Sequence, residues 1–302
     1  MKLGLALEGG ANRTIFSSGV CDGLLDLGIF PDCTVGVSAG IAYGVSYLAR
    51  QRGRNLAILT NYINDDRYMG ASHMINPLNN SYYNMDFIYD EIPNRLIPFD
   101  YEAFAAHTGT VEAVVTDVNT GAPAYLHVPP EDNKFMALRA TCALPMLFPV
   151  LEVDGIQCLD GGVTDPIPFE RCLQLGCDKV IVVATRERVY QKKQEVILTA
   201  AAAHYRKYPN FVDALKHRAD VYNRQREEMF RLEQQGDIFL FLPYNTEGFS
   251  RMERMLKRFM PCGSLEWIRS MHVSNHFGSI WMHKDKTRPP ACRRAFFFNQ
   301  SL

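Results

Sequence analysis

The chain has 302 residues, of which 47% are hydrophobic and 22% charged, and its formal net charge is −1. This composition is typical of an ordinary globular protein, and without an excess of basic residues a nucleic-acid partner is not expected. Glu8 interrupts the first apolar run before a signal-peptide core could form. No run approaches the roughly 18 apolar residues of a membrane helix. We therefore expect a cytoplasmic protein without a transmembrane segment, which contacts a membrane peripherally if at all.

Eight cysteines are spread along the chain without a CxxC pair or a zinc-finger spacing. We expect them to behave as small buried hydrophobic residues in a reducing compartment. No carboxylate cluster has EF-hand spacing, which argues against a calcium site. The sequence therefore predicts neither a metal nor a cofactor.

Strands and helices alternate over the first 50 residues. Leu3–Leu7 is a continuous apolar run, as in a strand buried on both faces. Residues 15–27 have helical spacing, which Gly28 stops. A strand at 33–37 and a helix from about 39 to 51 follow. This alternation predicts an α/β fold, with a mostly parallel sheet and helices packed on it.

The same alternation returns after residue 110. We expect strands at 111–116, 124–128, 148–153, 156–159, 179–184 and 238–242. We expect helices at 134–142, 168–175, 191–206 and 210–234. Asp154-Gly155 is typical of the tight turn of a hairpin. All of these elements belong to one predicted domain, residues 1–254.

Residues 60–100 interrupt the alternation, because asparagine, tyrosine and methionine are mixed there without a period. The segment is either an irregular excursion over the site, where a lid or acyl channel would lie, or a helical insertion that merely covers the sheet. We favour the first interpretation, because long irregular segments in compact domains are usually functional.

Residues 255–302 show no sustained period. They contain both tryptophans, Pro289-Pro290 and a cluster of basic residues. This tail is either an ordinary extension or a segment not selected for the fold, such as a read-through or frame-shifted end, and the sequence leaves both open. We expect poor order and no catalytic residue in it.

Ser38 is the candidate nucleophile, because Gly36-Val37-Ser38-Ala39-Gly40 places a G-x-S-x-G pattern at a predicted strand-to-helix turn. Gly36 and Gly40 fit a tight turn in which a Cβ would clash with neighbouring backbone. The hydroxyl then lies at a helix N-terminus, whose free amides favour a developing negative charge. The pattern alone also fits an ordinary turn, so the hypothesis needs catalytic partners.

An ester-cleaving serine needs a base and oxyanion donors. No histidine has a glycine-flanked strand-end context, and His127 is the reserve base of a histidine-dependent esterase. Asp160 ends a predicted strand, and Gly161 and Gly162 let another side chain approach it. In a parallel sheet it would converge with Ser38 at the carboxyl edge and serve as general base. Asp160-Gly161-Gly162 alone also fits a simple turn.

Gly9-Gly10-Ala11-Asn12-Arg13 is the candidate oxyanion loop. Gly9, Gly10 and Ala11 leave successive amides bare between a strand and a helix, where they can hold an oxyanion or a phosphate. Arg13 would steady the loop or meet a lipid phosphate. The spacing is neither G-x-G-x-x-G nor G-x-x-x-x-G-K-[ST], so a nucleotide site is not supported.

In this order, the glycine loop, the elbow and Asp160-Gly161-Gly162 resemble the patatin-like phospholipase family. The resemblance spans roughly residues 3–250 and includes the stretches 139–145 and 163–168. It implies a three-layer α/β fold, and a Ser38–Asp160 dyad that cleaves fatty-acyl esters through an acyl-enzyme. Residues 9–13 would form the oxyanion loop. The implied partner is a phospholipid or another acyl-ester lipid.

Two positions depart from the family's pattern. Ala11 replaces the third glycine of the loop, and Thr14 replaces the glycine after the basic residue. An alanine at positive φ would be strained. The alternative is therefore a catalytically weak or inactive lipid-binding or regulatory member of the same fold.

Overall fold

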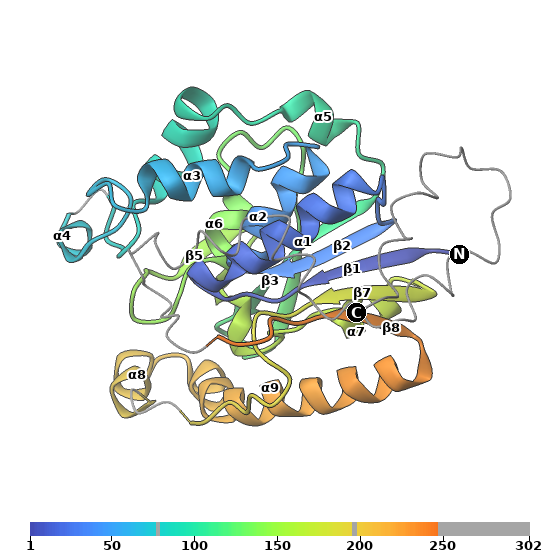
Figure 1. Cartoon of the computed structure of the whole chain (residues 1–302). Coiled ribbons are helices and arrows are strands. Elements are labelled where there is room, and N and C mark those ends of the chain that lie inside the picture. Colours follow the sequence, from blue (N-terminus) through green and yellow to red (C-terminus); the bar gives the residue numbers. More distant parts are fainter. Residues whose placement is uncertain (77–78, 195–197, 247–302) are drawn as a thin grey trace, which may run out of the picture.

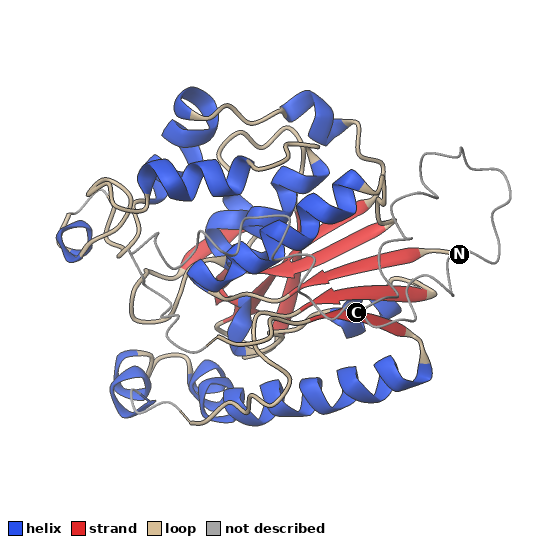
Figure 2. Ribbon diagram, viewed as in Figure 1, coloured by secondary structure: helices blue, strands red, loops and turns tan. Residues whose placement is uncertain are grey.

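Among the described residues, eight strands form one central sheet, and helices cover both of its faces (Figures 1 and 2). This computed structural model describes residues 1–76, 79–194 and 198–246. The three-layer α/β arrangement confirms the predicted fold class. The tail at 255–302 lies outside the described residues, so the domain boundary at 254 stays a prediction.

The parallel part of the sheet has the order β3-β2-β1-β7-β8. Its strands are β1 (Leu3–Leu7), β2 (Cys33–Val37), β3 (Thr110–Asp117), β7 (Lys179–Val183) and β8 (Ile238–Phe241). Antiparallel strands join at β3, and they are β4 (Pro123–His127), β5 (Leu151–Val153) and β6 (Ile156–Asp160). All eight correspond to predicted strands, although β5 begins later than predicted. β5 and β6 form the predicted hairpin.

Both faces of the parallel strands are buried. Helices α1 (Ile15–Asp26) and α2 (Ala39–Leu48) cover one face, with α3 (Arg54–Tyr62) packed over them, whereas α7 (Phe169–Gln174) and α9 (Pro209–Gln235) cover the other (Figure 1). Leu5 and Leu7 of β1 pack with α1 and α2, whereas Ala6 packs with α7 and α9. This alternation explains why the β1 sequence is apolar at every position. Helix α1 ends as predicted before Gly28, whose φ is 65°.

The remaining helical elements are short. They are η1 (Ala11–Thr14), α4 (Ala71–Met74), η2 (Phe87–Leu96), α5 (Tyr101–Ala105), α6 (Met136–Thr141), η3 (Gly161–Val163) and α8 (Leu198–His204). The helix predicted over 191–206 is wrong in its first part, since residues 191–194 form a loop. There the Asn223 side chain accepts from the N–H of Lys192 at 2.8 Å and donates to its carbonyl at 3.0 Å. These bonds engage the backbone groups that a helix would pair.

Residues 60–100 combine helical and irregular structure. The segment contains α4 and the π-helix η2, which includes Pro93, and irregular turns lie between them. It packs against the start of α1 in a separate apolar cluster that includes Ile15, Tyr68, Phe87 and Ile92. The π-helical geometry is often found at functional sites.

Strands β2 and β6 meet end to end along one edge of β3. Val114 of β3 pairs with Val37 at the end of β2, and Val115 pairs with Asp160 at the end of β6. Strand β4 takes the opposite edge. The expectation that Asp160 ends a parallel strand is wrong, because β6 is antiparallel to β3. Asp160 nevertheless approaches the residue after Val37, since the two strands run toward each other.

The described helices include none that is both long and apolar enough to cross a membrane. Within the described residues, no group of three or more His, Cys, Asp or Glu side chains is placed to hold a metal ion. The described cysteines carry free thiols, and all are buried as predicted except Cys142, which is half-buried. A cytoplasmic location stays a prediction.

Candidate active site

Ser38 joins β2 to α2 in a strained backbone conformation. Its φ of 52° and ψ of −135° are rare for a residue with a side chain. A Cβ on Gly40 would lie 2.6 Å from the carbonyl oxygen of Glu8, and one on Gly36 would lie 2.8 Å from the Cβ of Ile41. The predicted steric reason for both elbow glycines is therefore confirmed.

Thr141 of α6 holds this elbow in place. Its hydroxyl accepts the N–H of Ser38 at 2.8 Å and donates to the carbonyl of Val114 in β3. Thr141 is completely buried, so both bonds are shielded from water. Thr141 belongs to the stretch 139–145 that carries the family resemblance, but no local pattern marks its hydroxyl as part of the site.

Asp160 lies at the end of β6 and is only 2% exposed. Its Oδ1 accepts the N–H of Gly162 at 2.7 Å, and its own N–H donates to Ala143 at 2.8 Å. A Cβ on Gly161 would lie 2.2 Å from the carbonyl oxygen of Val114. This approach is close because β6 ends at this point of the β3 edge. The next residue of β3, Val114, is already paired with Val37 of β2. Gly161 therefore allows the turn, and Gly162 orients the carboxylate.

The glycine loop passes over Ser38. A Cβ on Gly9 would lie 3.1 Å from the Cβ of Ser38. The loop then enters η1, at whose start the amides of Gly10 and Ala11 have no helical acceptor. Ala11 has a φ of 47°, so the expected strain is present. The hydroxyl of Thr14 donates to the carbonyl of Ala11, and this bond ties down the strained peptide.

Glu8 anchors the same loop, although the sequence analysis does not single it out as a site residue. Its side chain is 3% exposed and accepts the N–H of Thr185 at 2.5 Å and the hydroxyl of Tyr222 at 2.9 Å. The Thr185 hydroxyl donates to the carbonyl of Gly9 at 3.1 Å. The signal in the sequence is a carboxylate directly after a fully apolar strand.

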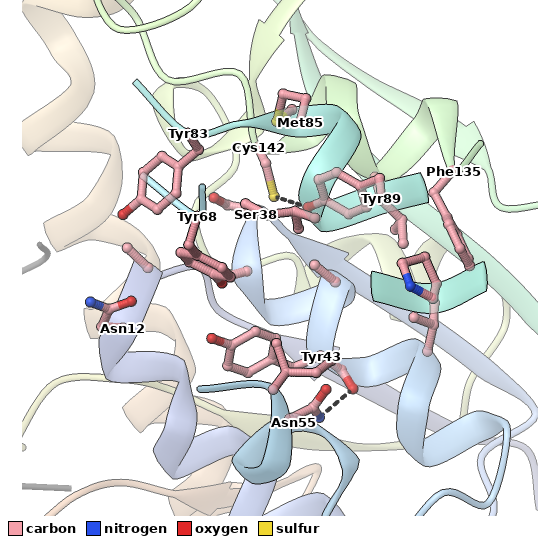
Figure 3. Close-up of a pocket in the computed structure, with 18 of the residues that line it drawn as sticks. Asn12, Ser38, Tyr43, Asn55, Tyr68, Tyr83, Met85, Tyr89, Phe135 and Cys142 are labelled. Atoms are coloured by element: carbon pink, nitrogen blue, oxygen red, sulfur yellow. Dashed lines mark hydrogen bonds between the residues drawn. The ribbon is translucent and has the colours of Figure 1, made fainter. Parts of the chain in front are cut away.

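Two cavities meet at Ser38, and both are lined by Ala11, Ser38 and Leu144. The first cavity encloses about 890 Å³ when the open space at its mouth is included. We call it the apolar cavity. Most of its wall is aromatic or apolar, and Figure 3 shows part of it around Ser38: Asn12, Tyr43, Tyr68, Tyr83, Met85, Tyr89, Phe135 and Cys142. The segment 60–100 therefore forms a wall beside Ser38 and does more than cover the sheet.

Cys142 lies next to Ser38 in the apolar cavity (Figure 3). Its thiol accepts the hydroxyl of Tyr89 at 3.1 Å and hydrogen-bonds with Ser38. Burial raises the pKa of Cys142 to about 12; the Asp160 carboxylate also raises it, and the hydrogen bonds to Tyr89 and Ser38 lower it. The thiol is therefore neutral at physiological pH and does not compete as a nucleophile.

The second cavity lies on the polar side of Ser38, and its volume is about 580 Å³ including its mouth. We call it the charged cavity. Its wall brings together Ser38, Asp160 and most of the candidate oxyanion loop. Its charged side chains are Glu8, Arg13, Asp160, Arg186, Lys192 and Arg218. Arg13 is 6% exposed, so this loop cation lies inside the protein.

His127, the reserve base, lies apart from Ser38. It ends β4 on the far edge of β3, and its side chain is exposed. In the described part of the chain, no histidine lines either cavity. His204 and His217 are exposed on α8 and α9, as predicted. Of the two candidate bases, Asp160 is therefore the one that lines a cavity together with Ser38.

Comparisons with known proteins agree with this fold. The model of the patatin-like phospholipase family matches residues 5–173, more than half of the chain. The chain belongs to the patatin-like phospholipase family. A second family model, described as a domain of unknown function (DUF6363), matches residues 208–260.

A relative in Escherichia coli strain K12 is the uncharacterized protein YjjU. It is 24% identical over 188 residues, which cover 61% of this chain and 52% of the relative. The match therefore spans about half the length of that protein. Because the relative is uncharacterized, it adds no activity to the family assignment.

Proposed function

We propose that the chain is a serine lipid acyl hydrolase that cleaves fatty-acyl esters through Ser38 and Asp160. The observation that carries the proposal is the position of Ser38 where two unlike cavities meet. One is lined mostly by apolar and aromatic side chains, as an acyl chain requires. The other contains Asp160 and the glycine loop, as the chemistry of ester cleavage requires.

In the proposed acylation step, the Asp160 carboxylate takes the proton of the Ser38 hydroxyl while Oγ attacks the ester carbonyl carbon. The carbonyl oxygen becomes an oxyanion, which the amides of Gly9, Gly10 and Ala11 stabilise. The tetrahedral intermediate collapses, the bond to the alcohol oxygen breaks, and Asp160 returns its proton to that oxygen. The alcohol leaves and an acyl-enzyme on Ser38 remains.

In the proposed deacylation step, a water molecule takes the place of the alcohol. Asp160 accepts a proton from this water, whose oxygen attacks the acyl carbonyl, and the same loop amides hold the second oxyanion. Collapse of the intermediate breaks the bond to Ser38 and returns the proton to its oxygen. The free fatty acid leaves and the starting state of the dyad is restored.

The apolar cavity supports a fatty-acyl chain as the group transferred to Ser38. Burial of each methylene contributes about 0.8 kcal/mol, so this cavity favours longer over short acyl groups. The substrates we propose are phospholipids or other acyl-ester lipids, cleaved as by a phospholipase A, a lysophospholipase or an esterase. Access to such lipids would require peripheral contact with a membrane.

Ala11 favours one alternative function. Its positive φ places strain in the loop that must hold the oxyanion. Loss of one oxyanion donor costs about 10²–10³ in rate, so a small displacement of this loop is enough to silence the site. The protein would then bind lipid without appreciable turnover, and its binding would be unaffected by Ser38→Ala.

The test is turnover of p-nitrophenyl esters of graded chain length by wild type, Ser38→Ala and Asp160→Asn. We expect preference for medium or long chains, and a loss on the order of 10⁴-fold or more in either variant. His127→Ala is the control and should match wild type. Activity retained in a folded Ser38→Ala protein would contradict the proposal. Inert but folded wild type would support the lipid-binding alternative.

A further inference from the structure

The wall of the charged cavity continues beyond the residues that the patatin-like model matches. That match ends at residue 173, yet Arg186, Lys192, Arg218 and Tyr222 line the cavity. Arg218 and Tyr222 lie on α9, within the 208–260 match to a domain of unknown function. A segment with no assigned role therefore forms part of the candidate active site.

One face of α9 contacts three segments of the site. Arg218 Nε donates to the carbonyl of Gly162 at 2.8 Å, beside the candidate base. Tyr222 donates to the glutamate that precedes the glycine loop. Gln225 donates to Asp165 Oδ1 at 2.6 Å, just after η3. Positions 218, 222 and 225 have the spacing of a single helix face, so α9 holds this wall of the cavity as one unit.

The balance of charge in the charged cavity is positive, with four cations against two carboxylates. Glu8 accepts hydrogen bonds from Thr185 and Tyr222, and one oxygen of Asp160 accepts from the N–H of Gly162. Among the described residues that line the apolar cavity, by contrast, Arg54 is the one cation and there is no carboxylate. Charges in a partly enclosed cavity interact more strongly than charges in water.

The aromatic rings of the charged cavity already have cations against them. The Arg186 guanidinium lies 4.3 Å from the centre of the Tyr190 ring, and the Lys192 ammonium lies 5.7 Å from that of Tyr222. A quaternary ammonium ligand would need such ring faces, and here it would meet like charges instead. A phosphate is complementary to the same side chains, because arginine and lysine both bind it with charge-assisted hydrogen bonds.

We propose that Arg186, Lys192 and Arg218 form a subsite that selects esters whose alcohol part carries a net negative charge as a phosphate. The inference rests on the proposed function, since it places the leaving alcohol in the charged cavity and the acyl chain in the apolar one. A phosphate-bearing glycerol ester without a cationic substituent fits the subsite. A zwitterionic head group with a quaternary ammonium does not.

The test compares two short-chain phospholipids with identical acyl chains, a phosphatidylglycerol and a phosphatidylcholine. Both are used as monomers, below the concentration at which they form micelles, so that no charged surface contributes. Wild type should favour the phosphatidylglycerol in kcat/KM by roughly tenfold or more. Arg186→Gln and Lys192→Gln should each reduce that ratio severalfold, and added salt should reduce it in wild type. Equal kcat/KM for the two lipids would overturn the proposal.

Matched control variants make the same change of charge outside the cavity. Lys193→Gln is the neighbour of Lys192, and Arg224→Gln lies on α9 with Arg218; both side chains are exposed. The head-group ratio should stay at its wild-type value in each. If either control lowers the ratio as much as Lys192→Gln does, the preference reflects overall charge and the subsite is wrong.

A binding measurement separates this inference from the proposed reaction. Calorimetry with the full-length Ser38→Ala protein and the same two monomeric lipids needs no turnover. Phosphatidylglycerol should bind roughly tenfold more tightly, and Lys192→Gln in that background should reduce the difference. Equal affinities would overturn the subsite whether or not Ser38 is catalytic. An absence of ester turnover with unequal affinities would contradict the reaction alone.

Discussion

The two cavities that meet at Ser38 come from different parts of the chain and differ in character. The apolar cavity takes much of its wall from residues 68–99 and has Arg54 as its one cation among the described lining residues. The charged cavity takes its cations from Arg13, from the loop after β7 and from α9. Under the proposed function, one half of an ester is held by burial and the other by charge. Changes on one side should therefore leave the preferences of the other unchanged.

Outside the Ser38–Asp160 dyad, the largest effect is expected at Thr141, which holds the elbow shared by both cavities. Thr141→Val keeps the shape but removes the hydroxyl that bonds Ser38 and Val114. Misplacement of the nucleophile should lower kcat by about 10²-fold for every acyl length and head group. Thr141→Ser restores the hydroxyl and should recover most of the loss. A change in substrate preference without loss of rate would contradict a role common to both sides.

The burial of Cys142 in the wall of the apolar cavity can be tested through the pH dependence of the free energy of unfolding. The thiol of Cys142 ionises near its ordinary pKa of 9.0 when unfolded, but burial holds its folded pKa at about 12. Because the folded state has the higher pKa, the stabilising contribution of the neutral thiol is fully present below pH 9. It is lost as the pH rises toward 12. Urea unfolding should show that Cys142→Ala loses about 2 kcal/mol less than wild type between pH 9 and 11. Parallel curves would contradict the burial of this thiol.

The preference for acyl-chain length should change when Ala42 is enlarged, because Ala42 lines the apolar cavity one helical turn after Ser38. Ala42→Leu fills space that an acyl chain would use, so long esters should lose roughly tenfold relative to short ones. The head-group ratio should not change. The control is Ala105→Leu, at an exposed position of α5. An unaltered chain-length profile in Ala42→Leu would place the acyl group elsewhere.

The smallest effect is expected at Tyr222, on the charged side. Tyr222→Phe removes one of the two hydrogen bonds to Glu8 and leaves a buried carboxylate oxygen without that donor. The loop before Ser38 should loosen, and kcat should fall about fivefold with the chain-length profile unchanged. The control is Tyr244→Phe, whose side chain is exposed. A shift in acyl preference in Tyr222→Phe would show that the two sides are coupled.

Much of the site can be predicted from the sequence because its parts are local. The apolar run Leu3–Leu7, the G-x-S-x-G elbow around Ser38 and the turn after Asp160 each depend on neighbouring residues, and each lies in the expected element. How Ser38 and Asp160 come together could not be predicted. Residue patterns do not encode strand direction, and β6 runs antiparallel to β3.

The contribution of α9 was also beyond prediction from local patterns. Its 3.6-residue period identifies a buried face, and the helix lies where it was expected. Its polar partners, however, are remote: Arg218 is 56 residues from Gly162, and Tyr222 is 214 residues from Glu8. Remote pairing also explains why the sequence pattern predicts a helix at residues 191–194, where the structure has a loop. The backbone of Lys192 pairs with the Asn223 side chain of α9, which no local pattern indicates.

The most direct test of the central claim is covalent labelling with a serine-directed fluorophosphonate, followed by intact mass and peptide mapping. The account predicts a single adduct on Ser38, which is absent in Ser38→Ala and forms far more slowly in Asp160→Asn. The account would be contradicted if folded wild type gave no adduct, or if the adduct persisted in Ser38→Ala.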